Sequence, residues 1–574
     1  MLKIYLSQIN TAVGDLAGNA QKILTEFYKA EAAKADLALF CEMTITGYPA
    51  QDLWQKKYFL EEVQEKLREI MLATKSAKCA ILVGAPYVSL NRAKKEVVSN
   101  AVFLIEKGEI ISIIRKKTLP NYGVFDERRY FEPDSALSFV EFRNQTLAIL
   151  LCEDIWDSKN IYLLQEQVFD SIISLNASPY QANKHLLRAQ VVQNVVQKVK
   201  KPVIYLNQVG AQDSLVFDGS SFVVNEKGET VLALSQFAPD SAVIELQKGS
   251  IAKEKISTPL FAAINNSNDN DLALEPLSQN GLDKQNNSYE ISRNYSACIL
   301  GLRDYIEKNN FKKVLLGMSG GIDSALVAAI AVDALGAENV ALYALPSRFN
   351  STESMRDAQE CAANLGLQLQ IISIENTFNA MLQTLENQGL TALAQENLQS
   401  RIRGNILMAL SNSTGALLLS TGNKSELATG YATLYGDMCG AFNPIKDVYK
   451  TQIYQLANWR NSKAPEISSY KKTALIPQNI ITKEPTAELR ANQKDSDLLP
   501  DYAMLDQILY AIIEQQKSVA EVIKKGFDEA VVKKVAKLFY SSEYKRKQAV
   551  IGPKISSMSF DLERRYPITN KFWQ

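Results

Sequence analysis

The sequence predicts an α/β protein of two domains, and three observations lead to this prediction. Short apolar runs typical of buried strands recur along both halves of the 574-residue chain and alternate with helical stretches. A polar, irregular stretch between about Gln247 and Ser288 separates the halves, because its composition cannot bury much apolar surface. A Ser-Gly-Gly-Ile-Asp-Ser run at 319–324 stands between an expected strand and an expected helix. We find no internal repeat.

In the first half, the expected strands predict a layered α/β domain with sheet-on-sheet or helix-on-sheet packing. They are residues 4–9, 37–41, 80–84, 101–105, 147–151, 171–175 and 203–206, and a helical stretch covers 20–35. In the second half, alternating strands and helices predict a parallel doubly wound sheet, which binds ligands at the carboxyl ends of its strands. Its expected strands are residues 314–317, 340–345, 370–374 and 416–420.

The run at 319–324 has the chemistry of a pyrophosphate-binding loop. Gly320 and Gly321 let the backbone approach phosphate oxygens, and the free N–H groups at the start of the following helix favour an anion. Ser319 and Ser324 add hydroxyl donors, and Asp323 can position a cation. A plain glycine turn is the alternative, but the two serines and the aspartate favour a nucleotide. The loop lacks the lysine of an ordinary phosphate loop, which argues against simple γ-phosphate transfer.

Composition narrows the class of protein. The net charge is zero with 63 residues of each sign, so no overall basic field points to nucleic acid or to an anionic membrane. Six scattered cysteines without metal-ligand spacing indicate a reducing compartment, and no apolar run is long enough to span a bilayer. We therefore expect a soluble cytoplasmic protein. His185 is the one histidine, so catalysis here must rely mostly on carboxylates, lysine, cysteine or metal.

A thiol at a strand end is the first candidate for catalysis. Cys152 directly follows the strand 147–151, Glu42 follows the strand 37–41, and Lys116 precedes a Leu-Pro-Asn-Tyr-Gly segment. A buried structural cysteine and a structural ion pair are the ordinary alternatives. Together, however, the three groups suffice for acyl transfer from an amide: Glu42 takes the thiol proton, Cys152 attacks the carbonyl, and Lys116 stabilises the oxyanion.

These residues and their surroundings, Glu-x-x-x-Thr-Gly-Tyr-Pro, Lys-x-x-Leu-Pro-Asn-Tyr-Gly and Cys-Glu-Asp-Ile-Trp, resemble the Glu-Lys-Cys site of the nitrilase superfamily over about residues 1–245. The resemblance implies a four-layer αββα sandwich and a cysteine thioester intermediate. It further implies that Glu127 orients Lys116 and that glutamine is bound by Tyr122, Ser178 and Lys184. The scheme gives His185 no chemical task, so we expect it to pack or to lie at the rim.

The second half carries polar residues after several expected strand ends. Asp323 and Glu426 could share Mg²⁺, and Lys450 and Thr486 could bind phosphates, although each charge alone could equally be a solvated or capping residue. This half, residues 291–574, resembles the NAD synthetase branch of the N-type ATP pyrophosphatases, which have an adenine nucleotide α-hydrolase-like fold.

That resemblance implies metal ligation by Asp323 and Glu426. It implies ATP contacts from Gly317, Met318, Ser319, Gly320, Gly321, Ile322, Asp323, Ser324 and Thr421, beside the phosphate-binding Lys450 and Thr486. It implies deamido-NAD contacts from Asn397, Arg401, Glu426 and Lys545. The chain has Gly430-Tyr431-Ala432-Thr433 where the family often has cysteine at the third position, a change that looks neutral for chemistry.

The two resemblances in this order are typical of the glutamine-dependent NAD synthetase family. They imply an amidase domain at 1–246, a linker at 247–290 and a synthetase domain at 291–574. The implied enzyme is a carbon–nitrogen ligase that amidates deamido-NAD to NAD at the last step of NAD biosynthesis. It uses ATP as substrate, Mg²⁺, and ammonia released from L-glutamine, and it leaves AMP and pyrophosphate.

We also expect a homo-oligomer, a sheltered ammonia path, and no nucleic-acid or membrane partner. Two other interpretations stay open. One is a ligase for a different carboxyl or carbonyl substrate, such as tRNA, which the lack of a basic field disfavours. The other is a regulatory protein with an inactive amidase half, which the intact Glu42, Lys116 and Cys152 disfavour.

Overall fold

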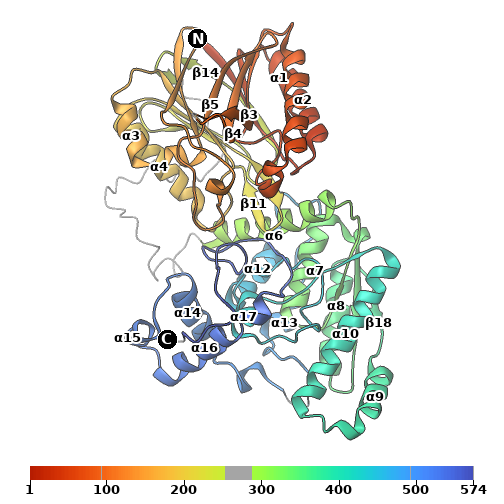
Figure 1. The fold of residues 1–574 in the computed structure, drawn as a ribbon. Helices are drawn as coiled ribbons and strands as arrows, with labels where there is room; N and C mark the ends of the chain where they lie inside the picture. Colours follow the sequence, from red (N-terminus) through yellow and green to blue (C-terminus); the bar gives the residue numbers. More distant parts are fainter. Residues whose placement is uncertain (92, 252–286, 491–492, 573–574) are drawn as a thin grey trace. The chain divides into compact units, whose positions relative to one another are not determined.

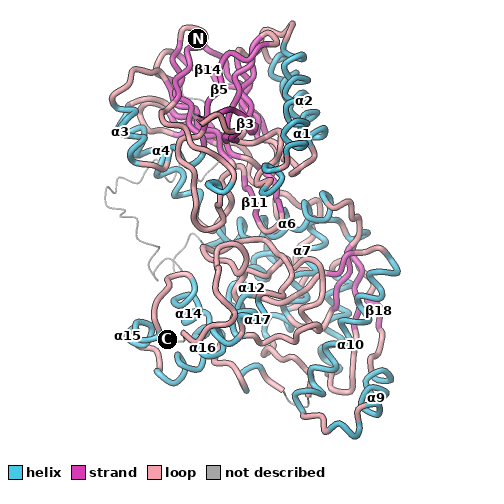
Figure 2. The backbone as a smooth tube through the Cα atoms, in the orientation of Figure 1, coloured by secondary structure: helices cyan, strands magenta, loops and turns pink. Residues whose placement is uncertain are grey.

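The computed structural model describes residues 1–91, 93–251, 287–490 and 493–572 (Figure 1). The chain forms two compact units whose boundary falls between residues 252 and 286, outside the described residues. Figure 2 shows that strands are concentrated in the first unit and that helices make up most of the second. In the described part of the chain, no helix has both the length and the apolar character needed to cross a bilayer.

The first unit contains two large sheets and a small hairpin. The seven-stranded sheet has the order β15-β14-β1-β2-β3-β4-β5, and the six-stranded sheet has the order β13-β12-β9-β8-β7-β6. The strands of the first are β1 (Leu2–Gln8), β2 (Leu37–Leu39), β3 (Ala80–Leu90), β4 (Glu96–Glu106), β5 (Glu109–Arg115), β14 (Asp240–Gln247) and β15 (Ser250–Ile251). Those of the second are β6 (Ser138–Phe142), β7 (Gln145–Leu151), β8 (Ser171–Asn176), β9 (Val203–Asn207), β12 (Phe222–Val224) and β13 (Thr230–Ala233). The hairpin pairs β10 (Val209–Gln212) with β11 (Leu215–Asp218).

Three hydrophobic cores arrange this unit in four layers. Ile4, Leu39 and Ile173 belong to the core in which side chains of the two sheets meet. Helices α1 (Leu16–Ala32) and α2 (Lys57–Thr74) cover the outer face of the first sheet, and α3 (Ser158–Gln165) and α4 (Lys184–Val199) cover that of the second (Figure 1). Successive side chains of a strand such as β1 therefore point in turn into the core between the two sheets and into the core under the helices. The αββα sandwich expected from the sequence is confirmed.

The second unit is built on a four-stranded parallel sheet of order β18-β17-β16-β19. The strands are β16 (Val314–Gly317), β17 (Val340–Ala344), β18 (Leu369–Ile371) and β19 (Leu417–Leu418). The strand order reverses between β16 and β19, and parallel α/β sheets bind ligands at such a switch point. The expected doubly wound sheet is confirmed.

Helices surround this sheet. They are α6 (Asn287–Lys308), α7 (Ile322–Leu335), α8 (Thr352–Asn364), α9 (Glu375–Thr384), α10 (Ala392–Thr414), α11 (Lys424–Thr429), α12 (Lys450–Ser462) and α13 (Gln478–Thr482). The last helices are α14 (Tyr502–Ile513), α15 (Val519–Lys524), α16 (Glu529–Ser541) and α17 (Glu543–Arg546). Helices α14, α15 and α16 share a hydrophobic core with α11. Helix α7 is apolar and buried almost all round, as expected for a helix enclosed by other elements.

The sequence located the central strands well and their limits less well. Strand β16 has the expected bounds, whereas β19 is shorter than the expected run 416–420. Helix α7 begins at Ile322, inside the predicted loop, and not at Ala325. Strand β15 and the first residues of α6 fall within the predicted linker 247–290, and residues 252–286 of that linker lie outside the described residues.

Candidate functional sites

The three residues predicted to cleave an amide all follow strand ends of the first unit. Glu42 lies shortly after β2, Lys116 directly after β5, and Cys152 directly after β7. All three are buried. Lys116 donates hydrogen bonds to Glu42 Oε1 at 2.7 Å and to Glu127 Oε1 at 2.9 Å, so one ammonium is shared by two carboxylates. The carboxylate-ammonium part of the predicted site is thus assembled, with Glu127 in direct contact with the lysine.

Burial and mutual charge perturb these groups strongly. Burial alone would lower the pKa of Lys116, but Glu127 and Glu42 raise it well above its ordinary value, so the lysine stays charged. Burial raises the pKa of Glu127 to about 7, against the opposing effect of Lys116. Burial, and then the charge of Glu42, raises the pKa of the Cys152 thiol well above its usual range. The thiol therefore rests protonated and needs a base at the moment of attack.

The backbone turns sharply at Cys152, where β7 ends. Cys152 has φ of +45°, a left-handed conformation that is strained for a residue with a side chain. It opens a short 3-10 helix, η3 (Cys152–Ile155), at the end of β7. A sharp strand-to-helix turn of this kind is suited to presenting a nucleophile at the edge of a sheet.

Two buried polar residues that the sequence did not single out hold this site in place. The side-chain amide of Asn100 donates to Glu42 Oε1 at 2.7 Å, and the backbone carbonyl of Asn100 accepts the backbone N–H of Lys116 at 2.8 Å. Asp154 accepts the backbone N–H groups of Thr118 at 2.7 Å, Leu151 at 3.1 Å and Lys117 at 3.2 Å. Asp154 therefore ties the segment that carries the lysine to the strand that carries the thiol. A polar residue inside the apolar strand β4 was the available signal for Asn100.

Of the predicted glutamine-binding residues, Tyr122 and Lys184 surround a carboxylate that sequence reasoning missed. Tyr122 donates to both oxygens of Glu153, at 2.9 and 3.0 Å, and Lys184 lies 5.9 Å from the centre of the Phe125 ring. Burial raises the pKa of Glu153, while Tyr122, Lys116 and Lys184 act to lower it. The position of Glu153 next to Cys152 in the sequence was the signal.

Ser178, the third predicted glutamine-binding residue, follows β8. Its backbone N–H donates to Asn207 Oδ1 at 2.9 Å, and its carbonyl accepts from Arg188 at 2.8 Å. Arg188 and Asp218 form a buried ion pair of 2.7 Å behind it. His185 is buried on α4, in agreement with an expected packing role.

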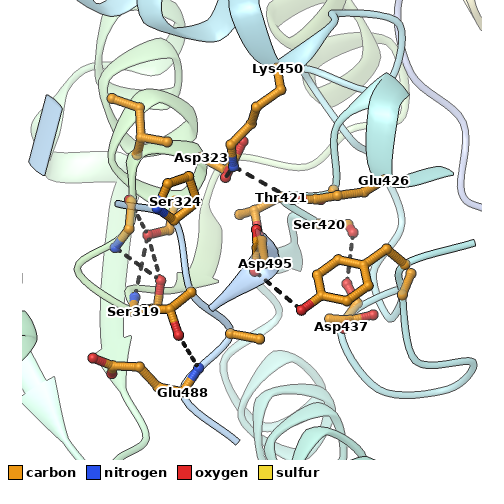
Figure 3. A pocket seen from close by; sticks show the side chains of 18 of the residues that line it. Ser319, Asp323, Ser324, Ser420, Thr421, Glu426, Asp437, Lys450, Glu488 and Asp495 are labelled. Atoms are coloured by element: carbon orange, nitrogen blue, oxygen red, sulfur yellow. Dashed lines mark hydrogen bonds and ion pairs between the residues drawn. The ribbon is translucent and has the colours of Figure 1, made fainter. Parts of the chain in front are cut away.

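In the second unit, a cavity lies at the switch point of the sheet. It is lined by the loop between β16 and α7, the segment after β19, and residues 483–488. The predicted residues that line it are Ser319, Gly321, Ile322, Asp323, Ser324, Thr421, Glu426, Lys450 and Thr486 (Figure 3). Gly317, Met318 and Gly320 lie in the same loop and are not among the lining residues.

The glycine loop is held in shape by its own serines. Ser324 Oγ donates to Gly321 O at 3.0 Å, and Ser319 Oγ accepts the N–H of Gly321 at 3.2 Å and lies 3.1 Å from Ser324 Oγ. Gly320 has φ of +82°, and a Cβ there would lie 2.1 Å from the carbonyl oxygen of Ser354 on α8. Only glycine lets the loop lie this close to α8.

The two predicted metal ligands meet a lysine in this cavity. Lys450 forms an ion pair with Asp323 and lies 3.6 Å from Glu426 Oε1 (Figure 3). Burial, and then the charge of Asp323, raises the pKa of Glu426 to about 8. Burial alone would lower the pKa of Lys450, but Asp323 and Glu426 raise it above its ordinary value. The pocket thus has a carboxylate that its surroundings only partly neutralise.

These residues fit Mg²⁺, because their oxygens are the ligands it prefers and a cation would relieve the repulsion between Asp323 and Glu426. Among the described residues, no group of three or more acidic, histidine or cysteine side chains could hold a metal. A bound Mg²⁺ would therefore need oxygens from a ligand as well, as is usual for this ion in phosphate sites.

The remaining predicted residues for deamido-NAD converge on one loop. Lys545 donates to the carbonyl of Ala432 at 2.6 Å, Arg401 to that of Leu434 at 3.2 Å, and Asn397 accepts from Thr433 at 2.7 Å. Tyr431 and Ala432 of this loop line the cavity. The hydroxyl of Thr486 donates to Gln493 O at 2.6 Å, within its own segment.

The fold and the two sites define a class: an enzyme in which a thiol amidase unit is joined to a nucleotide-binding ligase unit. Comparison with known proteins agrees. The carbon-nitrogen hydrolase family model matches residues 3–255, and the NAD synthase model matches residues 294–549. The glutamine-dependent NAD(+) synthetase of Thermotoga maritima is 40% identical over 100% of this chain and 99% of its own length, and that of Aquifex aeolicus is 39% identical over 100% of both chains.

The chain belongs to the glutamine-dependent NAD(+) synthetase family. The structure of the Acinetobacter baumannii enzyme in complex with adenosine diphosphate is similar with a TM-score of 0.74 and 36% identity, covering 99% of this chain and 98% of that one. The enzyme from Cytophaga hutchinsonii has the same fold, with a TM-score of 0.79 at 20% identity over 99% of this chain and 98% of that one. The two family resemblances expected from the motifs are confirmed.

Proposed function

We propose that the Cys152 site releases ammonia from glutamine, and that the glycine-loop cavity activates deamido-NAD with ATP so that ammonia can amidate it. The reaction as a whole is glutamine-hydrolysing NAD synthesis by a carbon–nitrogen ligase, in keeping with the family of the chain. The assignment of steps to residues is ours. The observation that carries it is the ammonium of Lys116, shared by Glu42 and Glu127 beside a protonated, buried thiol.

In the first unit, Glu42 takes the proton of Cys152 as sulfur attacks the carboxamide carbon of glutamine. Lys116 and the backbone N–H of Glu153 stabilise the oxyanion. The C–N bond breaks, ammonia leaves with a proton returned by Glu42, and water hydrolyses the thioester to glutamate. Tyr122, Ser178 and Lys184 hold the substrate, and Glu153 offers a carboxylate complementary to its α-ammonium group.

In the second unit, the nicotinate carboxylate of deamido-NAD attacks the α-phosphorus of ATP, and the bond to pyrophosphate breaks. The N–H groups at the start of α7 and the hydroxyls of Ser319 and Ser324 bind the phosphates. Lys450 neutralises phosphate charge. The Acinetobacter baumannii relative was solved in complex with ADP, which supports binding of an adenine nucleotide by this chain. Thr421 and Thr486 complete the ATP site. Asn397, Arg401 and Lys545 shape the loop against which deamido-NAD binds.

Asp323 and Glu426 would hold Mg²⁺, which supplies positive charge to the phosphate oxygens when bound. Ammonia then attacks the mixed anhydride, and AMP leaves as NAD forms. A sheltered ammonia path, a homo-oligomer and a cytoplasmic location remain predictions.

The experiment that tests this division of labour compares glutamine with ammonium chloride as nitrogen source for Cys152→Ala. We expect the variant to lose glutamine-driven NAD formation and to keep ammonia-driven formation, with one pyrophosphate released per NAD. Cys79→Ala, which removes another buried thiol of the first unit, serves as the control. Loss of both activities in Cys152→Ala, or no pyrophosphate release from deamido-NAD in the wild type, would contradict the proposal.

A further inference from the structure

The glycine loop contains no lysine, but the fold brings one to it from a distant segment. Lys483 directly follows α13 and lines the same cavity as Ser319 and Asp323. Its ammonium donates to Ser354 Oγ at 2.9 Å, to Asp357 Oδ2 at 3.2 Å and to the carbonyl oxygen of Gly320 at 3.4 Å. The last contact places a positive charge against the backbone of the predicted pyrophosphate loop.

The position of this ammonium is fixed from two sides. The glycine loop lies against the first turn of α8, because a Cβ on Gly320 would lie 2.1 Å from the carbonyl oxygen of Ser354. Asp357, on the same helix, also accepts a hydrogen bond of 2.7 Å from Asn479 of α13. The lysine is therefore anchored by α8 and α13 together, and its place does not depend on a bound ligand.

The three contacts of Lys483 differ in strength. The bond to Gly320 is long and joins a cation to a neutral carbonyl, so it is the weakest of the three. The N–H group that makes it can turn to an anionic oxygen at little cost, while Ser354 and Asp357 keep the side chain in place. Lys450 lies against Asp323, on another element of the same cavity.

We propose that Lys483 binds the leaving pyrophosphate of ATP, and so supplies from the segment after α13 the cation that the glycine loop lacks. The proposal rests on the proposed function of this cavity. Positive charge on the pyrophosphate stabilises the bond-breaking step, because negative charge accumulates on the leaving group as the carboxylate attacks the α-phosphorus. A lysine held beside the loop can follow the leaving group without blocking the approach of the carboxylate.

The other interpretation of Lys483 is a structural clamp between α8 and the segment after α13. The test uses the full-length protein with ammonium as nitrogen source, so that the Cys152 site takes no part. We compare Lys483→Met, Lys483→Gln and Lys483→Arg with Lys472→Met. Lys472 is exposed, and its ammonium donates to the backbone carbonyl of Asn364 at 2.6 Å. The measured quantities are the KM for ATP, the KM for deamido-NAD, and the inhibition constant of added inorganic pyrophosphate.

We expect Lys483→Met and Lys483→Gln to raise the inhibition constant of pyrophosphate and the KM for ATP by about tenfold or more, the size of one charge-assisted hydrogen bond. The KM for deamido-NAD should change little, Lys483→Arg should restore most of the pyrophosphate affinity, and Lys472→Met should behave as wild type. If Lys483→Met does not fold, Lys483→Gln and Lys483→Arg decide the question, since both can still donate to Ser354.

Pyrophosphate inhibition equal to that of wild type in Lys483→Gln would overturn the proposal. So would a rise in both KM values together with a lower melting temperature, which is the signature of a clamp. Wild-type protein that releases no pyrophosphate from ATP and deamido-NAD would instead contradict the proposed function, so the two failures are distinguishable.

Discussion

Replacing Lys116 by methionine removes the one cation that two buried carboxylates share. The side chain of Lys116 is 0% exposed, and its ammonium lies 2.7 Å from Glu42 and 2.9 Å from Glu127. Removing one partner of a buried ion pair costs about 3–5 kcal/mol, because the other charge stays buried without compensation. We expect the free energy of unfolding of the first unit to fall by about this amount at neutral pH.

The same variant loses catalytic stabilisation. Loss of one oxyanion donor costs about 10²–10³-fold in kcat. Glu42 also loses the ammonium that it contacts, so the base proposed for Cys152 is held less firmly in place. The rate of glutamine-driven NAD formation should therefore fall by at least about 10²-fold. Ammonia-driven formation, which needs only the second unit, should stay near the wild-type rate.

The assay compares both nitrogen sources and thermal melting for Lys116→Met and for Lys117→Met. The neighbouring Lys117 is a matched control, because its ammonium donates to Asn160 Oδ1 at 2.9 Å and not to a carboxylate of the site. The variant Lys116→Met should also regain stability as the pH falls, because the Glu127 carboxyl, whose pKa burial already raises, then becomes neutral. Glutamine-driven activity within tenfold of the control, or a parallel loss of ammonia-driven activity, would refute the reasoning.

Three more outcomes follow from the geometry. The pKa of Glu127 rises from 4.5 to about 7 on folding, so the first unit should gain about 3 kcal/mol as the pH falls from 7 towards 4.5, a gain that melting curves of Glu127→Gln should lack. Gly320→Ala, whose Cβ would meet Ser354, should lower ammonia-driven activity about 100-fold, whereas Gly389→Ala, with φ of +63° and open space around it, should not; equal rates would contradict the close approach. Asp154→Asn should lower kcat with glutamine about tenfold or more and leave ammonia-driven kinetics unchanged, because Leu151 N–H loses a charged acceptor; a matching loss with ammonia would argue against a local effect.

The sequence predicted the fold class and the central strands because these depend on local patterns. Apolar runs such as 147–151 and 314–317 are buried on both faces, so they stand out from their neighbours without any knowledge of their partners. The four-layer arrangement of the first unit came only from family resemblance. Which faces of β1 and β7 pack together is set by contacts between residues more than a hundred positions apart, which no local pattern reports.

The residues of the candidate sites also fall into two groups: those that local motifs could indicate, and those that only the fold shows. Glu42, Lys116 and Cys152 carry their chemistry in motifs at strand ends, so the sequence could nominate them. The polar side chain of Asn100 inside β4 was a signal, but nothing local to it indicated its partner, Glu42. Lys483 could not be nominated, because it acts on the loop at Gly320, far away along the chain. Their side-chain types are common on ordinary strands and loops, and only the fold shows what they face.

The protonated state of the Cys152 thiol also affects how readily it is oxidised or alkylated. Oxidants and alkylating reagents react with thiolates that solvent can reach, and Cys152 is 3% exposed with its pKa raised well above its ordinary value by burial and by Glu42. In the proposed mechanism, the thiol is therefore shielded between turnovers and becomes reactive only when Glu42 takes its proton. We expect iodoacetamide and hydrogen peroxide to modify Cys152 slowly at neutral pH. An enzyme with such a nucleophile can keep its amidase activity under mild oxidative stress, in which a low-pKa cysteine would be lost to sulfinic acid.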